Sequence, residues 1–446
     1  MTAVRTFLRP SLHACILLVF FLVPWWLRPN WLPSQPYVAG FLVSVPLALS
    51  IVLWLLMGAE GFFHLLRDSR RLWLLLAILF VAWAAWSPEW ALRRNVAQEA
   101  ASQLGLVLLF ALIVNCAGPS PRAIAAVLAA GLLFQGVIVI GQVILQRPVG
   151  LSSLGEFLIR PNRRGLSVLF AGGDELMRPY GLTIHPNVIG GYFAVALLAI
   201  SGWLITARHR WQLIVLYLIY AVGLWALLIT FSRSAILATA VGAACLVVFW
   251  GVKLRIITRP IVWRLVTLTV IASIASGGFV LTYSKFVLAR AGVGDEVTEL
   301  RSISDRRIFT QIGLDVIGEY PVTGVGLANF PYYAARWLFR SPYSELKPDF
   351  VHSYPLLVIT ELGFTGFILW AFLLSIGAGI AWKSARDPFA VGISAGAVAL
   401  LTVGLFDHYP WTILHFALLL WACLGVTMQR PRSSASTRHP PTASPL

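Results

Sequence analysis

The sequence predicts an all-α polytopic membrane protein of about twelve transmembrane helices, and three observations lead to that prediction. Hydrophobic residues make up 59% of the 446 residues, whereas charged residues make up only 12%. The apolar residues fall into blocks of about twenty, the length that a helix needs to cross a hydrocarbon core of ~30 Å. Only one long polar segment, 284–353, separates two of these blocks late in the chain. The expected spans are 12–27, 38–57, 72–86, 100–116, 122–145, 187–206, 211–231, 234–251, 263–283, 354–382, 388–406 and 410–428.

The first expected span is read as an uncleaved membrane helix. Its apolar run follows two arginines, as in a signal peptide, but that run leads into Pro24 and Arg28 without a small-residue cleavage site. The four cysteines of the chain each fall inside an expected span, scattered along the sequence. We therefore expect small buried side chains at these positions, with neither disulfides nor a metal site.

The basic residues orient the chain in the membrane. With the N-terminus inside, half of the 34 lysines and arginines lie in inner segments, together with only three of the 18 acidic residues. The positive-inside rule then predicts that both termini are cytoplasmic. The net charge of +16 reflects topology and attraction to anionic lipid, and no basic soluble domain supports nucleic-acid binding. We expect a single integral membrane domain over 1–429 and a disordered tail over 430–446, which is rich in Pro, Ser and Arg.

The polar segment 284–353 is expected to form a partly helical lid over a site. Ile308, Ile312 and Val316 recur at helical spacing with charged residues such as Arg306 among them. That pattern is typical of an amphipathic helix that rests on another surface. Because long loops without a function are uncommon in compact proteins, we interpret the segment as functional.

Polar residues gather near the outer ends of the expected spans. Arg178 follows a Gly-Gly-Asp turn, Arg233 lies between two spans, and His352 stands where the chain re-enters an apolar run. Three polar residues at these span ends also have a simpler interpretation. His185, which precedes Pro186, could start a helix, Arg233 could snorkel to lipid phosphate, and His352 could cap a helix at the interface.

These residue types suit chemistry on an anionic, lipid-linked substrate. Arginines bind phosphate oxygens with two parallel hydrogen bonds and stay charged, so Arg178, Arg233, and Arg306 or Arg307 suit a diphosphate. A histidine that titrates near neutral pH, His352, suits a general base beside them. The sequence contains no Asp-x-Asp pair, no His/Cys cluster and no glycine-rich nucleotide loop. We therefore expect neither a metal nor a cofactor.

Several motifs, taken in order, resemble the bacterial O-antigen ligase and Wzy-type polymerase superfamily. They are TIHPNVIGGY, TFSRSA, DRRIF followed by EYPVTGVGLANF, VHSYPLLVITELGFTG and LFDHYPW. The resemblance covers roughly residues 170–425, and the span number and the long late loop are also similar. It implies a membrane-embedded, GT-C-type, metal-independent inverting glycosyltransferase of the bacterial inner membrane. Such an enzyme would take a glycan from undecaprenyl pyrophosphate at the periplasmic face and transfer it to lipid A–core or to another glycan.

The resemblance also implies roles for individual residues. His352 resembles the general base that deprotonates the acceptor hydroxyl, although the family commonly has His-Asn where this chain has His352-Ser353. Arg178 and Arg233 resemble the arginines that hold the pyrophosphate leaving group. Asp407, with His185, would bind or orient the acceptor.

Three alternatives remain open beside a ligase. A Wzy-type polymerase shares these motifs, but the span number, the single late loop and the paired arginines favour a ligase. A protein O-oligosaccharyltransferase is less favoured because the C-terminal tail is short. A transporter or flippase of lipid-linked glycans belongs to a different class. Transporters commonly show repeated halves, which this chain lacks, and its polar residues gather on one outer face.

Overall fold

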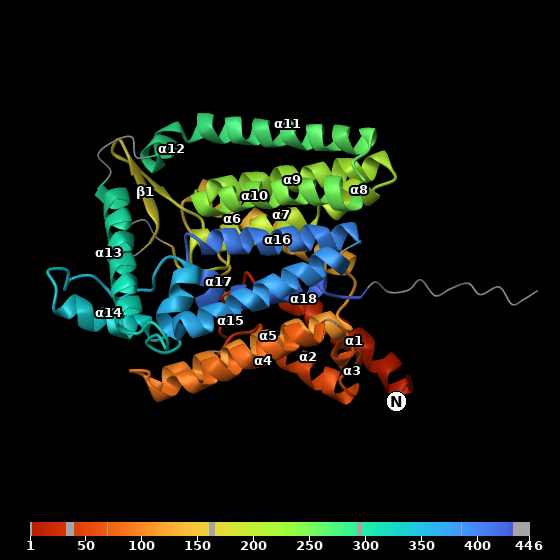
Figure 1. The fold of residues 1–446 in the computed structure, drawn as a ribbon. Helices are drawn as coiled ribbons and strands as arrows, with labels where there is room; N and C mark the ends of the chain where they lie inside the picture. The colour runs from red at the N-terminus through yellow and green to blue at the C-terminus, as the bar shows by residue number, and fades with distance from the viewer. Residues whose placement is uncertain are drawn as a thin grey trace, which may run out of the picture.

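The computed structural model describes residues 2–32, 40–68, 70–159, 166–291, 297–384 and 386–430. The expected tail over 430–446 therefore lies outside the described residues, apart from Arg430. Long helices run side by side in a bundle, and the polar elements gather at one end of it (Figure 1). We call this the loop end. The opposite end, which carries the N-terminus, is called the N-terminal end.

The elements follow one another in this order along the chain. The first half contains α1 (Thr2–Leu22), α2 (Ser44–Leu56), α3 (Phe62–Leu66), α4 (Arg70–Trp86), η1 (Ser87–Glu89), α5 (Arg94–Ala117), α6 (Pro121–Leu145), η2 (Ser152–Leu154), β1 (Val168–Ala171), β2 (Asp174–Met177), α7 (Pro186–Ala199) and α8 (Gly202–Thr206). The second half contains α9 (Arg210–Ile229), α10 (Arg233–Val248), the π-helical η3 (Phe249–Leu254), α11 (Arg259–Thr282), α12 (Ser284–Arg290), α13 (Val297–Glu319), α14 (Phe330–Phe339), α15 (Tyr354–Ser384), α16 (Pro388–Gly404), α17 (Tyr409–Thr412) and α18 (Leu414–Thr427).

The helices agree with a polytopic membrane protein. Within the described ranges, nine helices or helix pairs are long and apolar enough to cross a membrane. Three further apolar helices, α2, α16 and α18, coincide with expected spans but are only 13, 17 and 14 residues long. The total of twelve spans therefore stays a prediction.

Some expected spans contain breaks that the hydrophobic pattern does not reveal. The span 187–206 is divided into α7 and α8, and the span 410–428 is divided into α17 and α18 at Ile413. Helix α15 is interrupted at Gly363, whose φ of 67° and ψ of −176° are not helical. Apolar side chains occupy both sides of such a break, so the hydropathy pattern of the sequence does not detect it.

The expected all-α fold is interrupted by one β-hairpin in the segment before α7. Strands β1 and β2 pair antiparallel, with Ala171 opposite Asp174 at the turn. The two residues between them, Gly172 and Gly173, have φ values of 58° and 87°. A two-residue turn with positive φ at both positions matches the twist of paired strands, which explains the hairpin.

The loop end is built on α15, which supports most of the polar segment. Phe309, Ile312 and Val316 of α13 are buried, and α13 and α14 both contact α15. A helix is therefore present over Ile308, Ile312 and Val316, with the last two buried, whereas its amphipathic character and a lid function stay predictions. Within the bundle, α16 packs against both α7 and α10, which also contact each other. Gly392 allows the close approach to α7, because a Cβ there would lie 2.6 Å from the Leu198 carbonyl oxygen.

Candidate functional site

Four segments meet at the loop end and bring several of the predicted residues together. The His352 and His408 rings pack edge to face with their centroids 5.3 Å apart, which joins the residues before α15 to the turn before α17. Asn187, in the first turn of α7, donates from Nδ2 to Asp407 Oδ2 at 3.1 Å. The charge of Arg306, on α13, acts on the pKa of both His352 and His185.

Asp407 is the buried acidic centre of this cluster. Only 7% of its surface is exposed, and it accepts hydrogen bonds from Asn187 and from the backbone N–H of His408, the latter at 2.9 Å. Burial raises the pKa of its carboxyl, but the nearby histidines His408, His352 and His185, together with the Asn187 hydrogen bond, outweigh burial and lower it. Asp407 is therefore a carboxylate at neutral pH, and it offers negative charge to the rings around it.

His352 is half-buried and carries a ring nitrogen, Nδ1, that is buried without a hydrogen-bond partner among the described residues. Burial lowers the pKa of this imidazole, and the charges of His408 and Arg306 lower it further, whereas Asp407 and Asp349 oppose the shift. The ring is consequently uncharged near neutral pH and able to accept a proton. A carboxylate close by stabilises the imidazolium that would form.

His185 caps a helix, as the simpler interpretation of its sequence context proposed. It is the N-cap residue of α7, its Nδ1 accepts from the Asn187 backbone N–H at 3.1 Å, and Pro186 occupies the first helical position. Burial lowers its pKa to about 3, assisted by the nearby Arg178. A role for His185 in orienting an acceptor stays a prediction, since the cap already occupies one of its nitrogens.

Arg178 lies in a buried, fully engaged position rather than on an open surface. Its side chain is 4% exposed. Nε donates to the Thr230 carbonyl oxygen, Nη1 to Ser167 Oγ and Nη2 to Asn187 Oδ1, each at 2.8 Å. These bonds hold together the hairpin region, the turn between α9 and α10, and the start of α7. Through Asn187 they also reach Asp407.

The other three predicted arginines are more accessible. Arg233 begins α10, is exposed, and donates from Nη1 to the Arg290 carbonyl oxygen at 2.7 Å, while Arg290 Nη2 donates to the Phe231 carbonyl oxygen at 3.3 Å. These two bonds attach α12 to the α9–α10 turn. Arg306 is half-buried, and its Nε is buried without a partner in the described part of the chain. Arg307 is exposed on the same helix.

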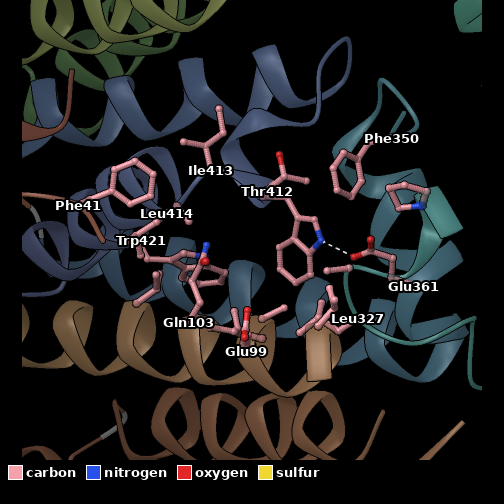
Figure 2. A pocket seen from close by; sticks show the side chains of 18 of the residues that line it. Phe41, Glu99, Gln103, Leu327, Phe350, Glu361, Thr412, Ile413, Leu414 and Trp421 are labelled. Atoms are coloured by element: carbon pink, nitrogen blue, oxygen red, sulfur yellow. Dashed lines mark hydrogen bonds between the residues drawn. The ribbon is translucent and has the colours of Figure 1, made fainter. Parts of the chain in front are cut away.

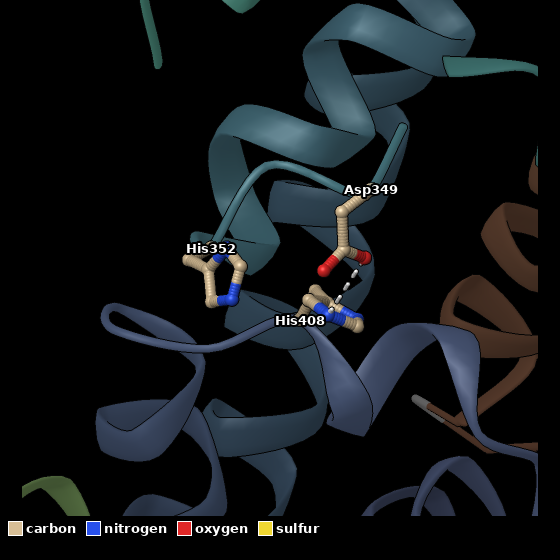
Figure 3. Close-up of side chains that lie close together, drawn as sticks. All are labelled: Asp349, His352 and His408. Atoms are coloured by element: carbon tan, nitrogen blue, oxygen red, sulfur yellow. Dashed lines mark ion pairs between the residues drawn. The ribbon is translucent and has the colours of Figure 1, made fainter. Parts of the chain in front are cut away.

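Two residues that received no chemical role from the sequence also belong to the site. Asp349 and His408 stand beside His352, and one potential ligand atom from each of the three lies within 4.8 Å of the others (Figure 3). His408 Nε2 lies 4.0 Å from Asp349 Oδ1. We call Asp349, His352 and His408 the His–Asp triad. Two imidazoles and a carboxylate can bind a divalent cation. The sequence predicted no metal, and the triad is the place where that prediction should be tested.

The pairing of Asp349 with His408 could not be found from spacing, because the two residues are far apart in the chain. The available signals were the position of Asp349 three residues before His352 and the Asp407-His408 pair in the LFDHYPW motif.

A mostly apolar cavity of about 420 Å³ opens next to the triad (Figure 2). At one end it is lined by Phe350 and Thr412, which both contact His408, through ring centroids 5.1 Å apart and through a 2.8 Å hydrogen bond to Nδ1. At the other end it reaches Phe41 and Trp421. The sequence did not reveal this cavity, because its wall is assembled from several helices.

Glu361 lines the same cavity. Among the described residues, its Oε2 accepts from Trp411 Nε1 at 2.9 Å (Figure 2). The break in α15 follows directly, at Gly363. The backbone N–H of Gly326 donates to the Glu361 carbonyl oxygen at 2.9 Å, so the loop before α14 inserts at this point.

Comparison with known proteins agrees with part of this description. Residues 218–371 match the family model described as O-antigen ligase (Wzy_C). No curated protein matches the chain. The matched segment includes Arg233, α13 and His352, whereas Arg178, His185 and Asp407 lie outside it. The resemblance to the O-antigen ligase and Wzy-type superfamily is thereby confirmed over this segment, and an enzyme of that general kind is supported.

Proposed function

We propose that the protein is an O-antigen ligase that transfers a glycan from undecaprenyl pyrophosphate to a sugar hydroxyl of lipid A–core. The observation that carries the proposal is His352. It is an uncharged imidazole beside the Asp407 carboxylate, at the loop end of a bundle of apolar helices and inside the segment that matches the O-antigen ligase family. The loop end would face the periplasm, and both termini would lie on the cytoplasmic side of the inner membrane.

In this mechanism His352 acts as the general base. Its ring nitrogen that faces Asp349 and His408 (Figure 3) takes the proton of the acceptor hydroxyl as the hydroxyl oxygen attacks the anomeric carbon of the donor. The bond from that carbon to the phosphate oxygen breaks, and undecaprenyl pyrophosphate leaves with the electron pair. A single displacement inverts the anomeric centre. The imidazolium is stabilised by Asp407 and Asp349, which both favour its charged form, and it returns its proton to solvent.

The accessible arginines would neutralise the leaving group. Arg233, Arg306 and Arg307 stand at the loop end, and the buried Nε of Arg306, which has no partner among the described residues, would donate to a phosphate oxygen. Arg178 would contribute to the same pyrophosphate site mainly by fixing the α9–α10 turn from which Arg233 projects. Preorganised positive charge at the leaving group lowers the barrier because the charge develops as the bond breaks.

The apolar cavity supports a lipid-linked substrate. Its wall of aromatic and aliphatic side chains ends beside His408, so an apolar chain or ring could lie there while the reacting groups stay at the triad. The uncharged His352 and the charged arginines have the charge states that this reaction needs without a cofactor. We propose that the reaction needs no metal.

The test is glycan transfer in proteoliposomes. Undecaprenyl-pyrophosphate-linked glycan would be supplied as donor and lipid A–core as acceptor, with wild type, His352→Ala and, as a matched control, His209→Ala, an exposed histidine at the N-terminal end. Glycosylated core with wild type and His209→Ala, but a loss of 10²-fold or more with His352→Ala, is expected.

The other outcomes each reject part of the proposal. If core stays unmodified while donor chains lengthen, the protein is a polymerase that uses the same base. If lipid-linked glycan only moves between leaflets, the enzyme assignment fails. Normal transfer by His352→Ala would show that His352 is not the general base.

A further inference from the structure

A polar cavity at the N-terminal end of the bundle, far from the His–Asp triad, has no part in the reaction described above. Its volume is about 640 Å³, and it lies between the starts of α1 and α4, helix α3, the junction of α5 with α6, and the residues after α18. The lining includes four arginines and a histidine: Arg5, Arg9, Arg70, Arg430 and His64.

Positive charge exceeds negative charge in this cavity. Two carboxylates compensate the four arginines. Arg9 pairs with Glu60, and Asp68 is shared by Arg70 and Arg430, with nitrogen–oxygen distances of 2.8 Å to each. Two positive charges therefore remain in excess. Arginines that snorkel at a membrane surface point outward singly, whereas Arg70 is only 6% exposed and is held between helices.

Two groups in the cavity retain donors for a ligand. Arg5 donates from Nε to the Met57 carbonyl oxygen at 3.0 Å, and its terminal nitrogens have no hydrogen bond to the described residues. Asn115 is 4% exposed and accepts from Arg70 Nη1 at 2.8 Å, but its Nδ2 is buried without a partner in the described part of the chain. A buried amide donor left unpaired costs free energy unless a ligand or water accepts from it.

We propose that this cavity binds a phosphate group, and specifically the headgroup phosphate of an anionic phospholipid. Guanidinium groups and an amide N–H are the donors that phosphate oxygens require. Basic pockets between transmembrane helices on one side of a bilayer suit anionic headgroups, because the acyl chains can remain beside the apolar helix surfaces. This inference is independent of the proposed transfer reaction, since the site lies at the opposite end of the bundle.

The test measures lipid binding to the delipidated, full-length protein by native mass spectrometry. Phosphatidylglycerol, phosphatidylcholine and inorganic phosphate would be titrated separately. Wild type should prefer phosphatidylglycerol to phosphatidylcholine by tenfold or more. The double variant Arg5→Gln/Arg9→Gln should weaken phosphatidylglycerol binding about 100-fold, because each lost charge-assisted bond changes affinity by roughly a factor of ten.

Two further variants control for misfolding and for the effect of general surface charge. His64 is exposed, so His64→Glu should leave packing intact while its added negative charge weakens binding. Arg67→Gln removes an exposed charge that does not line the cavity, and it should change affinity by less than about fivefold.

The possible outcomes separate clearly. If inorganic phosphate alone binds, with the same loss in the cavity variants, the phosphate site stands and its source is free phosphate. If the phosphatidylglycerol preference survives both Arg5→Gln/Arg9→Gln and His64→Glu, or falls equally in Arg67→Gln, the cavity is not the binding site.

Discussion

Replacement of Arg178 by alanine should destabilise the whole protein, beyond any effect on transfer. The guanidinium is buried, and its three hydrogen bonds reach Thr230, Ser167 and Asn187 on three different segments. Truncation removes all three bonds and leaves the Thr230 carbonyl and the Asn187 amide oxygen without these donors. It also leaves a void where the side chain packed.

The magnitude follows from these contacts. Hydrogen bonds to charged groups contribute about 1.5–3 kcal/mol each, so three of them set an upper limit of about 9 kcal/mol. Bonds made by one side chain are not additive, and breaking a buried charged contact typically costs about 3–5 kcal/mol. We expect Arg178→Ala to lose about that much free energy of unfolding. In a chain of this size the apparent Tm would then fall by roughly 5 °C.

The assay is thermal unfolding in detergent, followed by native-tryptophan fluorescence, with glycan transfer measured on the same samples. Arg233 provides the matched comparison because it is an exposed arginine. Arg233→Ala loses an exposed hydrogen bond to the Arg290 carbonyl oxygen, so it should lower stability by about 1 kcal/mol, less than Arg178→Ala, but reduce transfer. Arg233→Lys should be nearly as inactive, because a lysine does not bind phosphate with two parallel bonds. If Arg178→Ala unfolds at the wild-type temperature yet loses transfer, Arg178 contacts substrate directly and the structural interpretation is wrong.

Three further predictions concern the base, the metal and the helix break. Because the pKa of His352 is lowered from 6.5, the initial rate of transfer should be constant above pH 6.5 and fall as the pH drops through the lowered pKa. Asp407 opposes this lowering, so Asp407→Asn should move the fall in rate to still lower pH. A pH profile that does not move in Asp407→Asn would contradict the assignment. Chelation with EDTA should leave transfer intact, whereas strict dependence on an added divalent ion would identify the His–Asp triad as a metal site. Gly363→Ala should lower stability by about 3 kcal/mol in thermal unfolding, because its Cβ would lie 2.1 Å from the Val322 carbonyl oxygen at a positive φ; a neutral effect would mean that the loop shifts freely.

The sequence alone determined the general nature of the protein, because hydropathy is a local property. Blocks of about twenty apolar residues predicted the helices, and the spacing of Ile308, Ile312 and Val316 predicted an amphipathic α13. The motif around His352 predicted the family that the comparison over 218–371 supports. His185 as a helix start was also readable, because Pro186 follows it and proline fits the first turn.

Only the tertiary structure decided which polar residues meet, because contacts between distant segments leave no mark in local composition. Arg178 and Arg233 looked alike in sequence, yet one is buried in hydrogen bonds and the other is exposed. Asp349 and His408 lie beside His352 because α15 packs against α17. Hydrophobic periodicity fixes which face of each helix is apolar, but the packing of those faces against one another determines which helix ends come together.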